Sequence, residues 1–300
     1  MAPPGSRRDE RSPGVGGQRT LVKSWTVSSP TGRRLGDHVC WPFRRDADAV
    51  EVAQAYVAEG LAGRERVAYV GEGGPDELRH DLDGVPALNE ELDRGQLQLV
   101  PMNTLAGSEA SVDPAVELPQ LAAMTEDALV AGYRALRVFA HGTNRVRDPA
   151  QRARQVRYEH LIDRFCLEHP LTMLCAYDAA VLGNSAVAEL ACVHALAHEA
   201  LSPFQVHAAR SADAALAGNV DVFCTDQLEQ ALQRIGIATP GGTVVVDATG
   251  LEFMDVRGLL TLDRYAAASD TIMVLRSPPT VVTRLANLVD LIALRVEGGR

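Results

Sequence analysis

The stretch Asp247-Ala-Thr-Gly-Leu-Glu-Phe-Met-Asp-Val-Arg-Gly-Leu-Leu260 decides the fold of the second half of this chain. It follows the β-branched run Val244-Val245-Val246, which predicts a buried strand. Residues 247–250 are turn formers, and Asp255 is placed to cap a helix over about 256–268. A strand, a tight turn and a capped helix predict an α/β domain with an exposed loop at the end of the strand.

The same residues carry a family resemblance. Their types and order resemble the signature of STAS domains, D-x-S/T-G-x-x-x-[ILMV]-D-S-x-G-L, which is found in anti-sigma-factor antagonists. In that family a partner kinase phosphorylates the serine after the second aspartate, and Val256 stands at this place here. The resemblance covers residues 203–300 and implies a smaller C-terminal α/β domain with a mixed sheet.

The resemblance also implies a protein-binding face around the turn and the start of the helix. Its residues in this chain are Asp247, Thr249, Asp255, Val256, Arg257 and Gly258. The implied partner is an anti-sigma factor or a related GHKL-type serine-kinase protein. Because Val256 has no hydroxyl, we expect the domain to escape the usual phosphorylation, which would add about −1.5 to −2 charges. Whether Thr249 replaces the missing serine stays open at this point.

Length and composition predict a soluble globular protein of two domains. The chain has 300 residues, of which 46% are hydrophobic and 23% charged, as in ordinary globular proteins. No apolar run approaches the roughly 18 residues that a membrane span needs, and no secretory signal precedes the folded part. The five scattered cysteines form no C-x-x-C pair, which favours a cytoplasmic location.

The charge is uneven along the chain. Residues 1–34 hold seven basic and two acidic side chains, a net of +5, so the remainder of this −10 chain carries −15. An acidic body argues against nucleic acid as a partner, and we expect no membrane partner either. Residues 1–30 are rich in Pro, Gly, Ser and Arg and are expected to form a disordered basic tail. Lys23 is the only lysine, so the folded body has no Walker A lysine, and we expect neither a cofactor nor an enzyme.

Helical and strand patterns alternate from residue 36 onward. Predicted strands cover 66–70, 96–100, 135–140, 171–176, 204–208, 215–220, 243–246, 271–275 and 292–296. Predicted helices cover 48–63, 86–94, 114–131, 151–168, 186–200, 225–235, 256–268 and 279–289. In the first half this alternation predicts βαβ units around a mainly parallel sheet. Ser202-Pro203 marks the expected boundary between the two domains.

The first half resembles a second family. The segment Gly36-Asp-His-Val-Cys-Trp-Pro-Phe43, a helix, and then Gly60-Leu-Ala-Gly-Arg-Glu-Arg-Val-Ala-Tyr-Val70 are similar to the opening of MEDS sensory domains. Residues 132–139, 158–159 and 173–178 fit later blocks of that family. The resemblance covers residues 31–200 and implies a RecA-like three-layer domain that senses a ligand instead of hydrolysing ATP.

The pair His38-x-Cys40 is the sharpest local signal in the first half. In an extended segment both side chains lie on one face, where they can activate a thiol, bind a metal or contact a small ligand. The alternative is structural: His38 caps a turn and Cys40 packs in the core. The MEDS resemblance implies a ligand site for a small molecule, still unknown, that includes His38, Cys40, Trp41, Tyr158 and Glu159. By residue type alone, Trp41 fits the core better than a ligand cage. We assign no metal ligands and no catalytic residues.

Two further motifs favour structural interpretations. The glycine-rich segment 71–77 lies between a strand and a helix as phosphate loops do, but Asp76 and Glu77 would repel phosphate. His194 and His198 are four residues apart on the predicted helix 186–200, yet no third zinc ligand is apparent. This pair is expected on a solvated or interdomain helix face.

These observations predict a cytoplasmic signalling regulator. It would sense a small ligand through the first domain and act by protein–protein binding through the second. A nucleotide-binding enzyme on a RecA-like core and a degenerate scaffold protein are the two alternatives.

Overall fold

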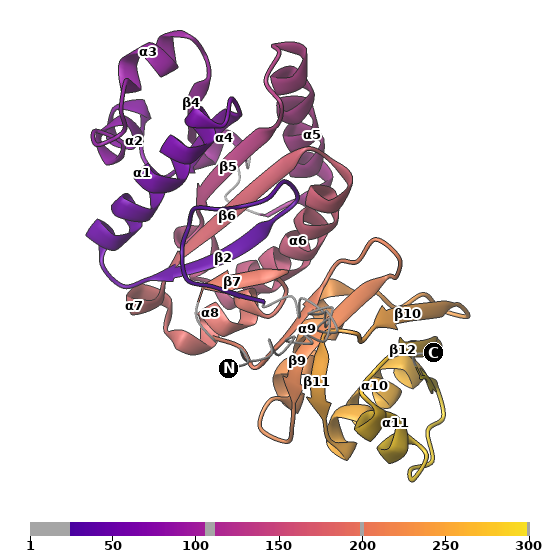
Figure 1. The fold of residues 1–300 in the computed structure, drawn as a ribbon. Helices are drawn as coiled ribbons and strands as arrows, with labels where there is room; N and C mark the ends of the chain where they lie inside the picture. The colour runs from indigo at the N-terminus through magenta and orange to yellow at the C-terminus, as the bar shows by residue number, and fades with distance from the viewer. Residues whose placement is uncertain (1–24, 106–111, 199–200, 299–300) are drawn as a thin grey trace, which may run out of the picture.

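The computed structural model describes residues 25–105, 112–198 and 201–298, which form two α/β parts, each built on its own sheet (Figure 1). The tail predicted to be disordered lies outside the described residues as far as residue 24. Within the described ranges, no helix is long and apolar enough to cross a bilayer.

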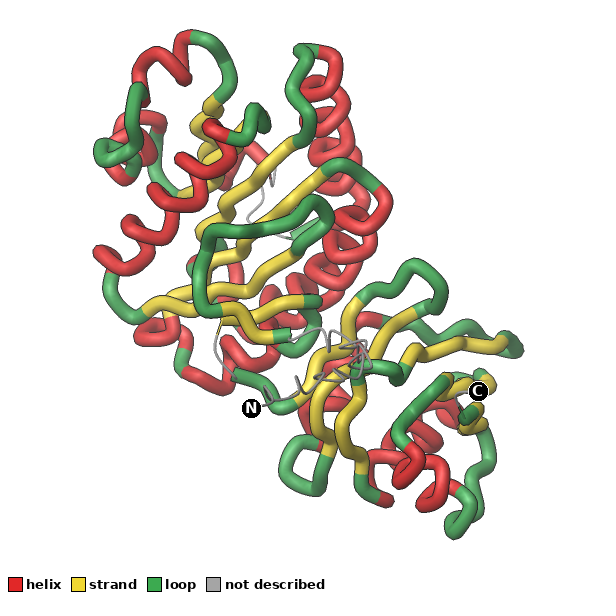
Figure 2. The backbone as a smooth tube through the Cα atoms, viewed as in Figure 1, coloured by secondary structure: helices red, strands yellow, loops and turns green. Residues whose placement is uncertain are grey.

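Seven parallel strands form the first sheet, in the order β1-β7-β2-β6-β5-β3-β4 (Figure 2). Their bounds are β1 Thr26–Val27, β2 His38–Phe43, β3 Arg66–Gly71, β4 Leu97–Pro101, β5 Leu136–His141, β6 Leu171–Asp178 and β7 Leu196–His198. The parallel sheet and the α/β class were both predicted, and the structure confirms them. Parallel sheets need cover on both faces, and the intervening helices supply it.

Helices cover the two faces of this sheet and complete three layers. They are α1 Asp46–Ala62, α2 Pro75–Asp81, α3 Leu88–Asp93, α4 Met102–Leu105, α5 Pro114–Val130, α6 Pro149–Glu168, α7 Ala179–Leu182 and α8 Asn184–Ala191, with a 3₁₀ turn at Asn144–Val146. Buried residues of α1 and α2 pack on one face, whereas those of α5, α6 and α8 pack on the other. Because strand side chains alternate, neighbouring residues of β2 and β6 enter different cores.

The prediction of one helix over residues 186–200 is wrong for its second half. Helix α8 ends at Ala191, and Leu196–His198 forms strand β7 between β1 and β2. The alanine-rich sequence favours a helix locally, but a short strand here completes pairing with two distant segments. Strand β1, Thr26–Val27, lies inside the stretch expected to be disordered, so the ordered chain begins earlier than predicted.

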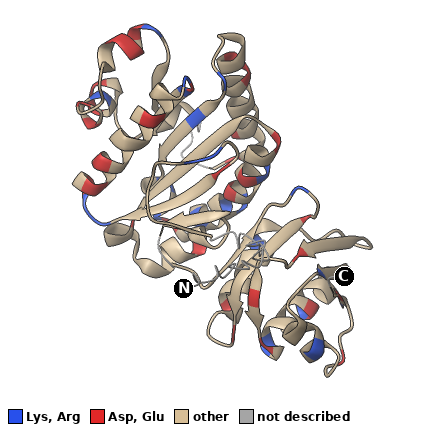
Figure 3. Ribbon diagram, viewed as in Figure 1, with Lys and Arg blue, Asp and Glu red and all other residues tan. Residues whose placement is uncertain are grey.

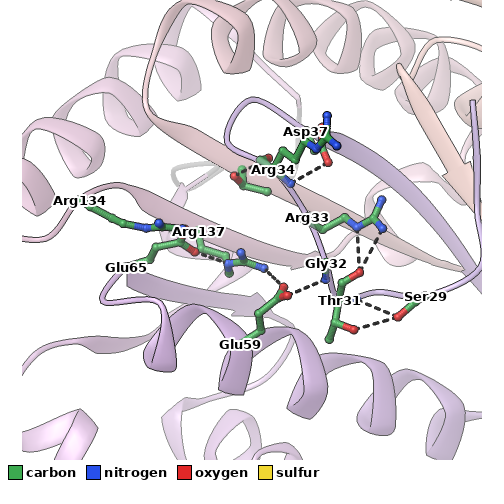
Figure 4. Close-up of polar contacts among 11 residues, drawn as sticks. Ser29, Thr31, Gly32, Arg33, Arg34, Asp37, Glu59, Glu65, Arg134 and Arg137 are labelled. Atoms are coloured by element: carbon green, nitrogen blue, oxygen red, sulfur yellow. Dashed lines mark hydrogen bonds and ion pairs between the residues drawn. The ribbon is translucent and has the colours of Figure 1, made fainter. Parts of the chain in front are cut away.

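A buried arginine ties the face covered by α1 together (Figure 4). Arg137 on β5 contacts the buried carboxylate of Glu65 and, at 2.7 Å, that of Glu59. Its guanidinium also lies 4.6 Å from the centre of the Tyr56 ring. Glu59 accepts a 2.6 Å hydrogen bond from the amide of Gly32, which ties the segment before β2 to helix α1.

The second sheet is smaller and mixed, as predicted. It contains β8 Phe204–His207, β9 Ala214–Val220, β10 Thr243–Asp247, β11 Leu251–Met254, β12 Ile272–Arg276 and β13 Leu294–Glu297. The parallel order is β11-β9-β10-β12-β13, and β8 pairs antiparallel with β9. Its helices are α9 Thr225–Ile235, α10 Val256–Ala268 and α11 Thr280–Ala286.

The stretch 247–260 folds largely as its sequence predicts. The Asp247 carboxylate accepts a 2.9 Å hydrogen bond from the amide of Thr249, which closes the turn. Asp255 caps α10 by accepting a 2.8 Å hydrogen bond from the amide of Gly258. Gly258 has no room for a side chain, since a Cβ would lie 2.7 Å from Met254. The prediction missed strand β11 between the turn and the cap.

The two parts pack closely against each other along α6 and α9 (Figure 1). One apolar core runs from α6 and α8 into β8, β9 and α9. Polar contacts cross the same boundary: Val206 donates its amide to the carbonyl of Cys192 at 2.6 Å, and Arg234 pairs with Glu189 at 2.6 Å.

In the view of Figure 3, acidic and basic residues are interspersed on α6 and α10.

Candidate functional site

A cluster of buried polar side chains lies between β2, β6 and α6. His38 comes from the start of β2 and Cys175 from β6, and both point to the α6 side of the sheet. Glu159 and Asp163 lie one turn apart on α6, so both face the sheet. His194 enters from the turn between α8 and β7, and all five side chains are nearly inaccessible to solvent.

Short distances connect the cluster. His38 Nε2 lies 3.2 Å from Glu159 Oε2, and His38 Nδ1 lies 3.3 Å from Asp163 Oδ1. The Sγ atom of Cys175 is 3.5 Å from both His38 Nε2 and Glu159 Oε2. His194 Nε2 lies 3.4 Å from the same Glu159 oxygen.

The two carboxylates hold His38 in its charged form. Burial alone would lower the pKa of His38, but hydrogen bonds to Asp163 and Glu159 outweigh it and raise this pKa from 6.5 to about 9. Burial would raise the pKa of Glu159, but His194 and His38 lower it well below its usual value. The cluster is therefore an ionic network inside an apolar core, where unpaired charges are costly.

A cavity of about 40 Å³ opens beside this cluster, between the sheet and helices α5 and α6. Its apolar wall includes Val70, Met102, Leu121, Met124, Val138, Ala140 and Met173. The polar side chains on its wall are Glu117, Arg145, Gln155, Tyr158, Glu159 and Tyr177. Tyr177 donates a hydrogen bond to Glu159, and Arg145 pairs with Glu117 at 2.7 Å. Glu159 thus belongs to both the cavity wall and the ionic network.

The structure brings together most of the predicted ligand site. His38 and Glu159 touch, and Tyr158 lies on the cavity wall with Glu159. Cys40 is buried on the same side of β2 as His38, next to Cys175 of the neighbouring strand, and does not line the cavity. Trp41 lies on the opposite face of the sheet, where it stacks on the His198 ring at 3.9 Å. Strand alternation separates it from the others.

Sequence reasoning missed three members of the cluster. Asp163 follows Glu159 by one helical turn, a spacing that could have identified it. Cys175 lies on the same face of β6 as Met173, but only the pairing with β2 brings it to His38. His194 was placed on a helix with His198, whereas it lies in a turn and only His194 reaches the cluster.

In the glycine-rich loop before α2, a carboxylate of the protein itself occupies the place where a phosphate group would bind. Glu77 accepts a hydrogen bond from the amide of Gly74 at the start of this helix. A Cβ atom at Gly73 would lie 2.6 Å from the same carboxylate. A phosphate group would need this place, which supports the structural interpretation of the loop.

The structure divides the predicted protein-binding face. Asp247 and Thr249 lie beside the start of β9, in a pocket that includes Leu167 of the first part, whereas the start of α10 lies where β9 and β11 stop. Asp255 and Val256 are half-buried there, and Arg257 is exposed. The loop that precedes α9 lies beside them, because Asp255 donates its amide to the carbonyl of Val220 at 3.0 Å. This loop presents Phe223, whose side chain is 92% exposed. Val222 of the same loop and Phe253 of β11 are exposed as well, at 42% and 39%.

The first part is therefore an α/β domain with an all-parallel sheet, a cavity between the sheet and helices α5 and α6, and a buried ionic network. Residues 37–195, more than half of the chain, match the family model of the methanogen/methylotroph, DcmR sensory domain, MEDS. The protein belongs to this family, which confirms the resemblance of the first half and indicates a role in sensing and signalling. The match does not extend to the second domain.

The other comparisons add little. No curated protein matches the chain. Among solved structures, one match is the DUF1998 helicase MrfA bound to DNA, at 11% identity and a TM-score of 0.33. The alignment covers 87% of this chain and 38% of the helicase. A likeness this remote carries no argument about function.

Proposed function

We propose that this protein senses a small, largely apolar molecule in the cavity of the first domain and responds through protein binding by the second. The observation that supports this most directly is the position of Asp163. One of its oxygens contacts His38, and the other accepts a 2.7 Å hydrogen bond from the amide of Ala208. Ala208 directly follows strand β8 of the second domain.

The cavity limits the size of the ligand. A buried water needs about 10–15 Å³ by the same measure, so 40 Å³ suits a molecule of about three or four heavy atoms. The apolar wall favours short hydrocarbon groups, and Glu159, Tyr177 and Arg145 offer polar contacts for one hydroxyl or similar group.

A ligand in this cavity can influence the second domain through one chain of contacts. Glu159 lines the cavity and contacts His38, His38 contacts Asp163, and Asp163 holds the backbone after β8. A ligand that competes for Glu159 changes the charge around His38. Because Asp163 also holds the backbone after β8, this change should alter the interface between the two domains.

Filling the cavity is expected to abolish ligand binding. In Ala140→Leu the longer side chain would occupy the cavity, at a cost in stability of about 1–3 kcal/mol from tighter packing. Calorimetry and thermal shift with xenon, ethanol and propanol measure the effect on the full chain. Val130→Leu, at an exposed position near the end of α5, is the control and should bind as the wild type does. Equal binding by both variants would contradict the proposed cavity.

For the second domain we propose a STAS-type role: it binds an anti-sigma factor or a GHKL-type serine kinase through the face defined by Asp247, Thr249, Asp255, Val256, Arg257 and Gly258. Support comes from the closed turn, the capped helix and the exposed Phe223 beside the start of that helix. Since Val256 offers no acceptor, the partner cannot release itself by phosphorylating that position. Regulation then passes to the first domain.

Phe223→Ser is expected to weaken this binding at least tenfold, because an exposed aromatic anchor would be lost. Pull-down and calorimetry with purified anti-sigma kinases, with and without ATP, give the affinities. Ile292→Ser, also strongly exposed but located before β13 at the other end of the sheet, is the matched control. If ATP releases the partner and places phosphate on residues 243–262, the proposal that phosphorylation does not control this domain is wrong. If both variants lose the same affinity for the partner, the proposed binding face is wrong.

A further inference from the structure

Four side chains with metal-binding atoms converge beside the cavity. They are His38, Glu159, Cys175 and His194, and one donor atom from each lies within 4.8 Å of all the others. All four side chains are buried. Two imidazoles, a thiol and a carboxylate form a mixed donor set of the kind that zinc and related transition metals prefer.

The separations between these atoms suit tetrahedral coordination. Glu159 Oε2 lies 3.2 Å from His38 Nε2 and 3.4 Å from His194 Nε2. Cys175 Sγ lies 3.5 Å from His38 Nε2 and from Glu159 Oε2. With bonds of about 2.0–2.3 Å, donor atoms around tetrahedral zinc are about 3.3–3.6 Å apart. The two remaining pairs lie within 4.8 Å, which small side-chain shifts can close.

Both histidines are already oriented for a metal. The Nδ1 atom of His194 lies 2.8 Å from the carbonyl oxygen of Leu190, and Nδ1 of His38 lies 3.3 Å from Asp163. A proton on each Nδ1 leaves the lone pair on Nε2, which faces the other donors. The Nε2 atom of His194 makes no hydrogen bond among the described residues although it is buried. Carboxylate and carbonyl partners of this kind orient histidine ligands in metal sites.

The charge of the donor set also fits a divalent ion. Glu159 and a Cys175 thiolate contribute two negative charges, and the two neutral imidazoles contribute none. A 2+ ion therefore balances the two negative charges of the four ligands, which lowers the cost of burying them. Binding displaces the thiol proton and the second proton of His38.

We propose that His38, Glu159, Cys175 and His194 bind one divalent transition-metal ion, with Zn²⁺ as the best match. The four ligands come from β2, α6, β6 and the segment after α8, so the ion joins elements that are distant in sequence. Because Glu159 and Cys175 also line the cavity, the ion lies at the cavity wall. The site shares Glu159 and His38 with the proposed path from the ligand, but its test needs neither the ligand nor the partner.

Metal binding to the full chain tests the proposal. We expect chelator-treated wild-type protein to bind one equivalent of Zn²⁺ and to melt at a higher temperature when loaded. Loading with Co²⁺ should give thiolate-to-metal charge-transfer absorption and the strong visible bands of a tetrahedral site. Cys175→Ser should lose the charge-transfer band, and His194→Gln should weaken Zn²⁺ binding at least about 100-fold.

Matched variants separate this site from adventitious binding. Cys192→Ser removes another buried thiol, and His169→Gln removes an exposed imidazole, so both should bind one equivalent as the wild type does. If the ligand variants fail to fold, the stoichiometry and Co²⁺ spectrum of the wild type still decide the question. If the protein binds less than one equivalent of metal in excess Zn²⁺, or if the Co²⁺ spectrum lacks a thiolate band, the proposal is wrong. The cluster is then a metal-free network of hydrogen bonds and ion pairs.

Discussion

Replacing Arg137 with methionine is expected to lower the free energy of unfolding by about 3–5 kcal/mol. The guanidinium is 2% exposed and is shared between Glu65 and Glu59, with Tyr56 packed against it. Burial would lower the pKa of Arg137, but Tyr56 and the neighbouring carboxylates raise it, so the side chain is charged. Without it, the Glu65 carboxylate stays buried and keeps only the exposed Arg134 as an ion-pair partner among the described residues. Denaturant titration measures the change.

Arg134→Met is the matched control, because Arg134 contacts the same Glu65 carboxylate at 2.6 Å from an exposed position. Exposed pairs contribute little, so this variant should lose only about 0–1 kcal/mol. The double variant Arg137→Met with Glu65→Leu should regain most of the loss, since an apolar replacement of a buried pair is often neutral. Similar losses for the two single arginine variants would show that burial does not set the strength of this network.

Asp163→Leu is expected to loosen the junction between the domains as well as the cluster. It removes the acceptor for the Ala208 amide and the partner of His38 Nδ1, at a cost of about 3–5 kcal/mol. Hydrogen exchange at the Ala208 amide should accelerate at least tenfold, because a buried donor without an acceptor is exposed by smaller fluctuations. Exchange mass spectrometry on the full chain reads this amide directly.

Two variants calibrate that result. Asp163→Asn retains an acceptor oxygen and should lose about 1–3 kcal/mol. Arg164→Met removes a neighbouring contact across the same boundary, a 2.5 Å hydrogen bond to the carbonyl of Asp213, but at an exposed position. Its loss should stay within about 1 kcal/mol. Unchanged exchange at Ala208 in Asp163→Leu would mean that the carboxylate does not connect the domains.

Local patterns were sufficient for most of the fold. Helix α10 begins at Val256 because Asp255 caps it, and both were predicted from the sequence. Strand β7 was missed because Leu196–His198 has helical composition and becomes a strand only by pairing with β1 and β2. Strand β11 was missed for the same reason, since its pairing with β9 is not encoded in its own four residues.

In the candidate site, too, some residues could be predicted from the sequence and others are brought in only by the tertiary fold. His38 and Glu159 were predicted because a family resemblance marked them, and in the structure they contact each other. Cys175 and His194 join them only through strand register and a turn, which composition does not encode. The MEDS resemblance grouped Trp41 with His38, although an odd spacing along an extended strand places the two side chains on opposite faces.

The shared core along α6 and α9 has a consequence for motion. Only residues 199–203 separate β7 from β8, and the hydrogen bond from Val206 to Cys192 closes this junction from both sides. We therefore expect no large hinge motion between the two parts. A structural response to a ligand should instead be a shear motion, in which packed helices slide by about 1–2 Å. Its outward sign would be a small change of surface shape, with the overall dimensions of the molecule preserved.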